Sequence, residues 1–319
     1  MKVAVLDDYQ EAVKTLDCFD LLSGHDVTVF NKTYTNEDEL AQKLADVEAV
    51  VLIRERTIIT DSLLSKLPKL KLISQTGKIS NHLDLATCHK FGVAVAEGRG
   101  SPVAPSELCW ALIMAASRNI PEYVNNLEQS QWQQSGAVGL GRTLNGLTLG
   151  IWGYGKIGQR IAQYAKAFGM SVLVWGSVSS RALAVSHGFS AAQTKQAFFS
   201  AADVVSLHLR LNEATKHCVT QEDLSVMKKD SLFVNTSRAE LVQSGALYLE
   251  MKANPTKRAA LDVFEIEPAT LDNEPLISLA NVLCAPHIGY VEKGSYALYF
   301  KIAFENVVAF AEGRPENIA

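Results

Sequence analysis

A glycine-rich turn between an apolar strand and an amphipathic helix constrains this chain more than any other feature. The segment LTLGIWGYGKIGQRIAQYAKAFG, residues 147–169, places Gly153, Gly155 and Gly158 in the spacing G-x-G-x-x-G. The first glycine permits a tight turn, and the second lets the backbone approach a pyrophosphate. The third lets the helix pack close to the strand. With a strand before it and a helix after it, the turn predicts a dinucleotide-binding unit.

The helix that follows the turn begins with Lys156 and Ile157. The first N–H groups of a helix have no partner within it, and the helix dipole favours an anion at the same place. The backbone at these two residues is therefore expected to meet the pyrophosphate. The alternative is a glycine turn with a structural purpose only.

The next apolar strand ends without the acidic residue that such a unit usually carries. Asp or Glu normally stands about 20 residues after the turn and bonds the adenosine ribose hydroxyls. Here the segment SVLVWGSVSSR, residues 171–181, has Gly176 at the strand's tip, and no acid occurs before Asp203. The absence of an acid removes a barrier to the 2′-phosphate of NADP, and Ser177 and Arg181 are candidates to bind that phosphate. A structural interpretation is equally open: Ser179 or Ser180 caps a helix, and Arg181 is a solvated residue of its first turn.

Strand-like and helix-like stretches alternate almost throughout the chain, which predicts parallel sheets built from right-handed βαβ units. A long helical region, residues 104–129, separates two sets of strands, and one amphipathic helix is expected over residues 296–310. The expected strands are the apolar runs KVAVL, DVTVF, AVVLI, KLIS and VAVA, followed by LTLGIW, SVLVW, DVVSLHL, SLFVN, AALDVF and NVLCA.

Composition excludes several classes of protein. With 319 residues, 48% of them apolar, the chain suits about two globular domains. A net charge of −4 gives no basic field to recruit nucleic acid or an anionic membrane. The longest apolar run, residues 108–116, is well short of the roughly 20 residues that span a bilayer. Five cysteines without CxxC pairing predict neither a disulfide framework nor a metal site, and the expected location is the cytoplasm.

Several widely separated motifs stand in one order along the chain. They are TGKISNHLDL, SELCWALIMAASRNIP, the glycine turn, DVVSLHLRLNEAT, LFVNTSRAELV, LDVFEIEP and APHIGY. By these motifs the chain resembles the D-isomer-specific 2-hydroxyacid dehydrogenases nearly end to end. The resemblance implies an α/β fold of two doubly wound parallel-sheet domains. A Rossmann NAD(P)-binding domain, 104–288, is inserted into a flavodoxin-like substrate domain, 1–103 plus 289–319, with the substrate between them.

The same resemblance implies three catalytic residues. Arg238 in NTSR would bind the substrate carboxylate with its planar guanidinium and polarise the 2-carbonyl. His287 in APHIGY would be the acid in reduction and the base in oxidation, and Glu267 in DVFEIEP would favour the charged imidazole. Each alone would be an ordinary surface or loop residue, and only their joint occurrence in matching motifs indicates catalysis.

Further positions are implied for the cofactor. Asp262 matches the acid that holds the nicotinamide carboxamide, and Thr236 should lie alongside the cofactor. The family's His-x-Pro-Leu is His208-Leu209-Arg210-Leu211 here, so Arg210 beside the adenosine becomes a second candidate for a 2′-phosphate. The family's general preference places NAD ahead of NADP, and both stay open.

For the substrate, Gly77 and Lys78 match a loop whose amides hold the carboxylate, and Arg54 resembles a residue that touches the distal part of larger substrates. The alternatives are a strand-to-helix turn and an exposed loop charge. The expected substrate is a small 2-keto or D-2-hydroxy acid. Glyoxylate, hydroxypyruvate, phosphohydroxypyruvate and larger acids all stay open.

Three related proteins are rivals to this interpretation. A phosphoglycerate dehydrogenase stays open, although the chain ends soon after the last helix and no regulatory domain is expected. A dinucleotide-sensing corepressor shares the motifs, but its long tail is not expected here. A formate dehydrogenase is disfavoured because its relatives carry Gln where Glu267 stands. Relatives form a two-fold dimer through the helix-rich segment 104–146, so the resemblance implies a homodimer through the nucleotide domain.

Overall fold

The structure, a computed structural model, describes residues 1–319 and divides into two compact units. The first unit joins Met1–Ser101 to Val291–Ala319, and the second is Pro102–Tyr290. The limits expected from the sequence were 1–103 with 289–319, and 104–288. Each unit holds one wholly parallel sheet, so the predicted doubly wound α/β class is confirmed.

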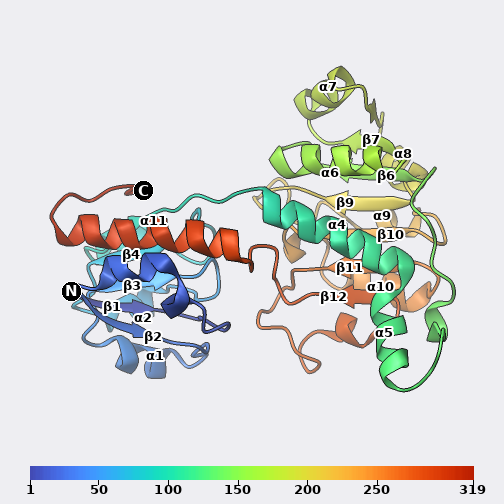
Figure 1. The fold of residues 1–319 in the computed structure, drawn as a ribbon. Helices are drawn as coiled ribbons and strands as arrows, with labels where there is room; N and C mark the ends of the chain where they lie inside the picture. The colour runs from blue at the N-terminus through green and yellow to red at the C-terminus, as the bar shows by residue number, and fades with distance from the viewer. The chain divides into compact units, whose positions relative to one another are not determined.

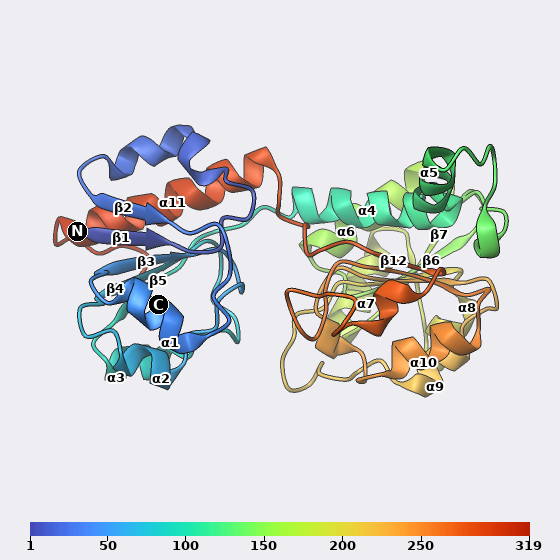
Figure 2. The same ribbon diagram turned by 90° about the horizontal axis from the view of Figure 1, so that it is seen from below.

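The first unit has a five-stranded sheet in the order β2-β1-β3-β4-β5, which is the flavodoxin-like order (Figure 1). Buried residues of α1, α2 and α3 form a core on one face of the sheet, and α11 lies on the other face with η2 (Figure 2). The elements are β1 (Lys2–Val5), η1 (Val13–Thr15), η2 (Asp17–Leu22), β2 (Asp26–Val29), α1 (Glu37–Leu44), β3 (Ala49–Leu52), α2 (Asp61–Ser65), β4 (Leu72–Gln75), α3 (Leu85–Lys90), β5 (Ala94–Ala96) and α11 (Lys293–Ala311).

The second unit has a seven-stranded sheet in the order β12-β11-β10-β9-β6-β7-β8. The six strands from β8 to β11 follow the Rossmann order, and β12 extends that sheet by one strand. The strands are β6 (Thr148–Trp152), β7 (Ser171–Trp175), β8 (Ser190–Ala191), β9 (Val204–Leu207), β10 (Leu232–Asn235), β11 (Arg258–Leu261) and β12 (Val282–Cys284). The helices are α4 (Val103–Arg118), α5 (Ile120–Glu128), η3 (Gly136–Val138), α6 (Lys156–Ala167), α7 (Val178–Ser186), α8 (Lys195–Ala201), α9 (Gln221–Ser225), η4 (Ala239–Leu241), α10 (Ala246–Ala253) and η5 (Pro275–Ser278).

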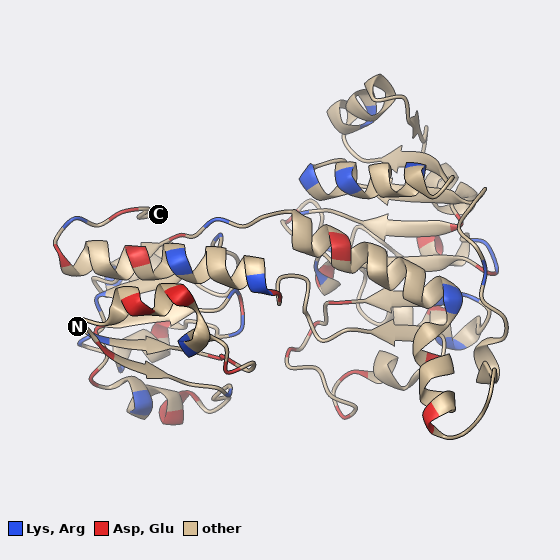
Figure 3. Cartoon of the chain, in the orientation of Figure 1, with Lys and Arg blue, Asp and Glu red and all other residues tan.

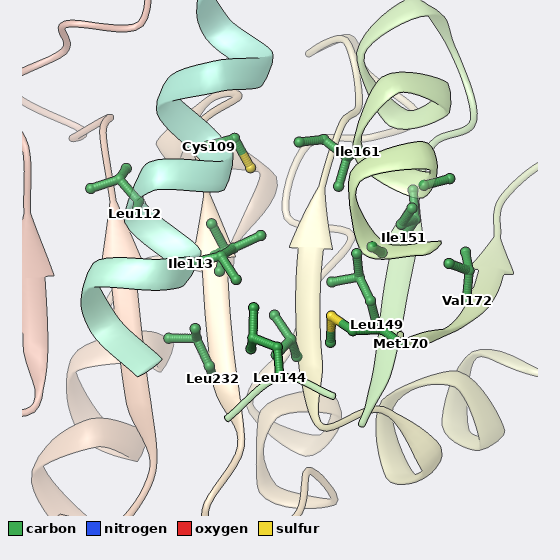
Figure 4. Packing of buried hydrophobic residues seen from close by; sticks show 14 of the residues in the cluster. Cys109, Leu112, Ile113, Leu144, Leu149, Ile151, Ile161, Met170, Val172 and Leu232 are labelled. Atoms are coloured by element: carbon green, nitrogen blue, oxygen red, sulfur yellow. The ribbon is translucent and has the colours of Figure 1, made fainter. Parts of the chain in front are cut away.

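Both faces of the second sheet are covered by helices. On one face, α4 and α6 bury Ile113 and Ile161 against strand residues such as Leu149 and Leu232 (Figure 4). On the other face, Phe198, Phe199 and Phe233 lie in a second core with residues of α9 and α10. Every residue of β9 and β10 is buried, as expected for parallel strands covered on both sides.

Two details differ from the sequence prediction. The expected helical region 104–129 is two helices, because Asn119 adopts the left-handed conformation (φ 53°) at the end of α4. Pro121 then lies in the first turn of α5, where its missing N–H costs no hydrogen bond. The two-residue edge strand β8 was not predicted, since it has no apolar run to reveal it.

Candidate active site

The carboxyl ends of six neighbouring strands bring together the residues predicted for the cofactor and for catalysis in the second unit. The glycine turn follows β6, the segment with Gly176 follows β7, and His208 follows β9. Arg238 follows β10, Asp262 follows β11, and His287 follows β12. Ligands of open α/β sheets bind at this edge. The order across the sheet therefore runs from the catalytic residues, through the glycine turn, to the tip of β7.

Glycine is suited to the three positions of the turn for different physical reasons. Gly153 has φ of 101°, and a Cβ there would collide with the carbonyl oxygen of His208. A Cβ on Gly158 would collide with the carbonyl oxygen of Gly153. Gly155 has an ordinary φ of −84°, and nothing lies within 4 Å of where its Cβ would stand. The fold thus requires the first and third glycines, whereas the second leaves open space that fits the approach of a phosphate.

The N-terminus of α6 has the donors that such a phosphate needs. Gly155 is its N-cap residue, and no side chain caps the N–H groups of the first turn. All three charged residues of this helix are basic: Lys156, Arg160 and Lys166 (Figure 3). A positive helix end with uncapped amides offers the donors and the charge that a pyrophosphate requires.

At the tip of β7 a serine caps the following helix, but it is neither of the two serines named in the structural alternative. Ser177 is the N-cap of α7 and accepts from the Ser180 N–H (3.2 Å), so the alternative in which Ser179 or Ser180 caps the helix is wrong. Gly176 has φ of 148°, a conformation that an acidic residue rarely adopts. The backbone here therefore disfavours an acid at the strand's tip.

Arg181 is half-buried, and it is not the solvated residue of the structural alternative. Its guanidinium lies 4.9 Å from the ring centroid of Trp175 and donates to the carbonyl of Ala192 (3.3 Å). A stacked, hydrogen-bonded guanidinium is held in place and must give up contacts to turn toward a new anion. Arg210, by contrast, is exposed in the loop after β9.

His208 lies next to the glycine turn, and its ring is held by Ser206. The two side chains extend from the same face of β9, with His208 Nε2 3.0 Å from Ser206 Oγ. Burial lowers the pKa of His208 to about 4. The imidazole is therefore neutral near pH 7, and it adds no charge to the cofactor edge of the sheet.

Glu267 and His287 form the closest pair of predicted catalytic side chains. His287 Nδ1 lies 2.6 Å from Glu267 Oε2, and Glu267 Oε1 accepts from the Phe264 N–H (3.0 Å). Both side chains are partly exposed, His287 by 22% and Glu267 by 36%. The carboxylate fixes the ring through Nδ1, so Nε2 is the nitrogen available to a reacting oxygen.

Asp262 has a role in this structure that the sequence did not reveal. It is 1% exposed, and its two oxygens accept from the N–H groups of Ile288 (2.8 Å) and Gly289 (2.9 Å). His287 has φ of 51°, a strained backbone conformation that costs on the order of 1–3 kcal/mol. The bonds from Asp262 to the next two residues hold that conformation. The sequence carried no local signal of this contact, because it arises from the adjacency of β11 and β12 in the sheet, which brings their carboxyl ends together.

Burial raises the pKa of Asp262 to about 6, and the two backbone bonds and His287 oppose this rise. Because this pKa lies above the ordinary value of an aspartate carboxyl, Asp262 takes up a proton in the folded protein as the pH falls toward 6. Above that pH the Asp262 carboxylate is mainly charged, and both of its oxygens carry no proton and accept the two backbone N–H groups.

Arg238 extends from the turn after β10, two strands away from β12. Its Nη1 donates to the Ser237 carbonyl (2.6 Å), and its own carbonyl accepts from the Asn235 side chain (2.8 Å). Thr236 precedes it in the same turn, directly after the strand. These bonds fix the turn that carries the candidate carboxylate-binding residue.

The residues predicted to contact the substrate lie in the first unit, at the carboxyl ends of β3 and β4. Arg54 follows β3 and lies against Gly77, where a Cβ would collide with its Nη1. Lys78 is exposed and pairs with Glu97. The structure therefore brings Arg54 and the Gly77 loop together, as adjacent parallel strands require.

Two general findings accompany the site. No group of three or more His, Cys, Asp or Glu side chains is arranged to hold a metal ion. None of the helices combines the length and the apolar character needed to cross a membrane.

Known proteins are similar to this chain over most of its length. Residues 110–289 match the model of the D-isomer specific 2-hydroxyacid dehydrogenase, NAD binding domain. The glyoxylate reductase of Aeropyrum pernix is 32% identical over 311 residues, which cover 95% of this chain and 92% of that protein. The D-3-phosphoglycerate dehydrogenase of Methanocaldococcus jannaschii is 33% identical over 91% of this chain, which spans only about half (53%) of that relative's length. A solved structure described as a phosphoglycerate oxidoreductase from Vibrio cholerae is 63% identical and has a TM-score of 0.97, with 98% of this chain and 99% of that chain covered.

Proposed function

The chain belongs to the D-isomer-specific 2-hydroxyacid dehydrogenase family, and we propose that it transfers a hydride between a nicotinamide cofactor and C2 of a 2-keto or D-2-hydroxy acid. The pair formed by Glu267 and His287 is the observation that carries this proposal. When bound, the cofactor supplies or accepts the hydride. The chain's own residues bind the acid and move the proton.

In the proposed reaction His287 delivers a proton from Nε2 to the substrate oxygen in reduction and removes it in oxidation. Glu267 holds the ring through Nδ1 and so aims Nε2 at the substrate oxygen. Arg238 binds the substrate carboxylate, for which a planar guanidinium offers two parallel donors. Asp262 positions His287 through the amides of residues 288 and 289, and its remaining lone pairs can accept from the nicotinamide carboxamide.

The residues expected to hold the cofactor follow the edge of the second sheet. Gly153 and Gly158 shape the turn, Gly155 gives the open approach, and the amides of Lys156 and Ile157 offer the donors. Thr236 after β10 and His208 after β9 stand between the turn and the catalytic residues in strand order. This arrangement supports a dinucleotide with its nicotinamide end toward β10–β12.

We propose NAD as the cofactor, with only modest discrimination against NADP. Two candidates for the 2′-phosphate already have partners, since Ser177 caps α7 and Arg181 stacks on Trp175. No carboxylate at Gly176 repels the phosphate, so NADPH is not excluded either.

An assay matrix tests both the reaction and this cofactor choice. Glyoxylate, hydroxypyruvate and phosphohydroxypyruvate are each supplied with NADH or NADPH, and steady turnover is measured. We expect turnover with NADH, a preference over NADPH of less than about tenfold, and little change in either affinity in Arg181→Ala. Absence of turnover on every keto acid contradicts the enzyme proposal and favours a dinucleotide-sensing protein. An NADPH preference that Arg181→Ala abolishes contradicts the choice of NAD.

We also propose a homodimer formed through the segment 104–146. Ile120, Val124 and Leu127 recur at helical spacing on α5 and are 48%, 50% and 54% exposed. Trp132 and Leu140 in the following segment are 74% and 85% exposed. A cavity of about 290 Å³ adjoins α4 and α5, lined mostly by apolar residues. Exposed apolar surface of this kind is typical of an interface, and a two-fold axis would cover it with its own copy.

Leu127→Glu is expected to convert the dimer to a monomer, because a charge would be buried unpaired in the interface. The mass in solution, measured by light scattering after size exclusion, checks this. Leu249→Glu is the matched control, since Leu249 is 59% exposed on α10, outside the segment. A monomeric wild-type protein, or equal dissociation in the control, argues against this interface.

A cytoplasmic location is proposed on the basis of the cysteines. All five are free, and they are scattered over both units. Unpaired cysteines are typical of a reducing compartment.

A further inference from the structure

Two loops meet at the carboxyl edge of the first unit's sheet, where β3 and β4 pair in parallel. The Arg54 N–H donates to Thr76 Oγ1 (3.0 Å), and the Gln75 side-chain amide donates to the Arg54 carbonyl (3.0 Å). Arg54 has φ of 55°, so its backbone conformation depends on such support. The guanidinium therefore extends from a fixed point beside the Gly77 loop.

The guanidinium of Arg54 pairs with the carboxylate of the next residue, Glu55. The two groups are 3.4 Å apart, and their side chains are only 19% and 18% exposed. Partly buried charges are screened by salt much less than surface charges are. The Arg54 guanidinium also lies 6.0 Å from the ring centroid of Tyr299, whose hydroxyl stays neutral because burial raises its pKa. An anion that approaches Arg54 therefore also meets the carboxylate of Glu55.

Lys78, the cation of the Gly77 loop, has an acidic partner as well. Lys78 pairs with Glu97, and the Ile79 N–H donates to the same carboxylate (3.0 Å). The four side chains Arg54, Lys78, Glu55 and Glu97 thus carry two positive and two negative charges. Arg56, the remaining cation of the loop after β3, donates to the Asp7 carbonyl (2.6 Å) and lies over the Tyr9 ring. Arg54 and Lys78 each have a carboxylate beside them, which weakens their attraction for a second anionic group of a substrate.

We propose that these loops select 2-keto acids whose part beyond C2 is uncharged, and that they disfavour a phosphorylated substrate. This inference rests on the proposed function, because it takes Arg54 and the Gly77 loop to face the substrate. A phosphate ester carries about −1.5 to −2 charges near pH 7, which Arg54 cannot neutralise while Glu55 remains beside it. A hydroxyl, by contrast, can donate to the Glu55 carboxylate, so a small hydroxylated acid suits the site.

The experiment compares kcat/KM for hydroxypyruvate and phosphohydroxypyruvate, which differ only by the phosphate. With saturating NADH, wild type is expected to prefer hydroxypyruvate by at least about tenfold. Glu55→Gln removes the negative charge and keeps the shape, so it should lower that preference about tenfold. Glu48→Gln is the matched control: Glu48 pairs with Lys71 just before the amino end of β3, and its loss should leave the preference unchanged.

Two results would overturn the inference: equal or better use of phosphohydroxypyruvate by wild type, or an unchanged preference in Glu55→Gln. Inhibition of wild type by inorganic phosphate gives a readout that does not depend on the variant's folding. Weak inhibition supports a neutral site, whereas strong competition with hydroxypyruvate contradicts it. Failure to reduce either keto acid contradicts the proposed function instead, so the two proposals can be told apart.

Discussion

His287→Ala is expected to lower kcat for keto-acid reduction by about 10²–10⁴-fold, the usual contribution of a positioned general acid. The imidazole is held 2.6 Å from Glu267 through Nδ1, and alanine removes the proton donor while leaving the glycine turn untouched. The affinity for NADH, measured by fluorescence titration, should therefore stay within about twofold of wild type.

His89→Gln is the control for this variant, because His89 is exposed on α3 of the first unit. It should have wild-type kcat. Unchanged turnover in His287→Ala would remove this residue from the mechanism. A large loss of NADH affinity would instead mean that the loop it occupies, which Asp262 holds, supports the cofactor.

Arg238→Lys is expected to lower kcat/KM by about 10²–10³-fold although it keeps the charge, since a lysine cannot offer two parallel donors to a carboxylate. The turn after β10 is fixed by bonds between Asn235 and residues 237 and 238, so the backbone cannot move a lysine ammonium inward to compensate. Most of the loss should appear in KM, because binding of the substrate carboxylate is the contact removed. Steady-state kinetics over a range of keto-acid concentrations measure this.

Arg314→Lys makes the same chemical change at a side chain that is 68% exposed, and it should be silent. If Arg238→Lys has wild-type KM and kcat, the carboxylate is bound by other residues. In that case the amides of the Gly77 loop become the leading candidates.

Much of the cofactor edge was predictable because the information lies in neighbouring residues. The spacing of Gly153, Gly155 and Gly158 between a strand and a helix specifies its own backbone path, so the turn is where the sequence placed it. The absence of an acid after β7 was also visible, although the sequence did not reveal that Gly176 has a φ unfavourable to one. The serine that caps α7 was misjudged by two or three positions, since several serines fit the same pattern.

The partners of the catalytic and substrate residues were harder to predict, because they come together only in the folded sheet. Asp262 and His287 are separated by a loop and a strand, and they meet because β11 and β12 are neighbours. Arg181 was assigned to solvent or to a phosphate, yet its stacking on Trp175 depends on how α7 lies over β7.

The sequence by itself determined the fold class, the position of the dinucleotide turn and, through its motifs, the identity of the candidate catalytic residues. Only the tertiary structure decided which distant charges pair, as Lys78 does with Glu97. The physical reason is range. Backbone turns and helix starts are set by residues a few positions apart, whereas the strength of an ion pair depends on the distance between the charges and on their burial, which only the folded chain defines.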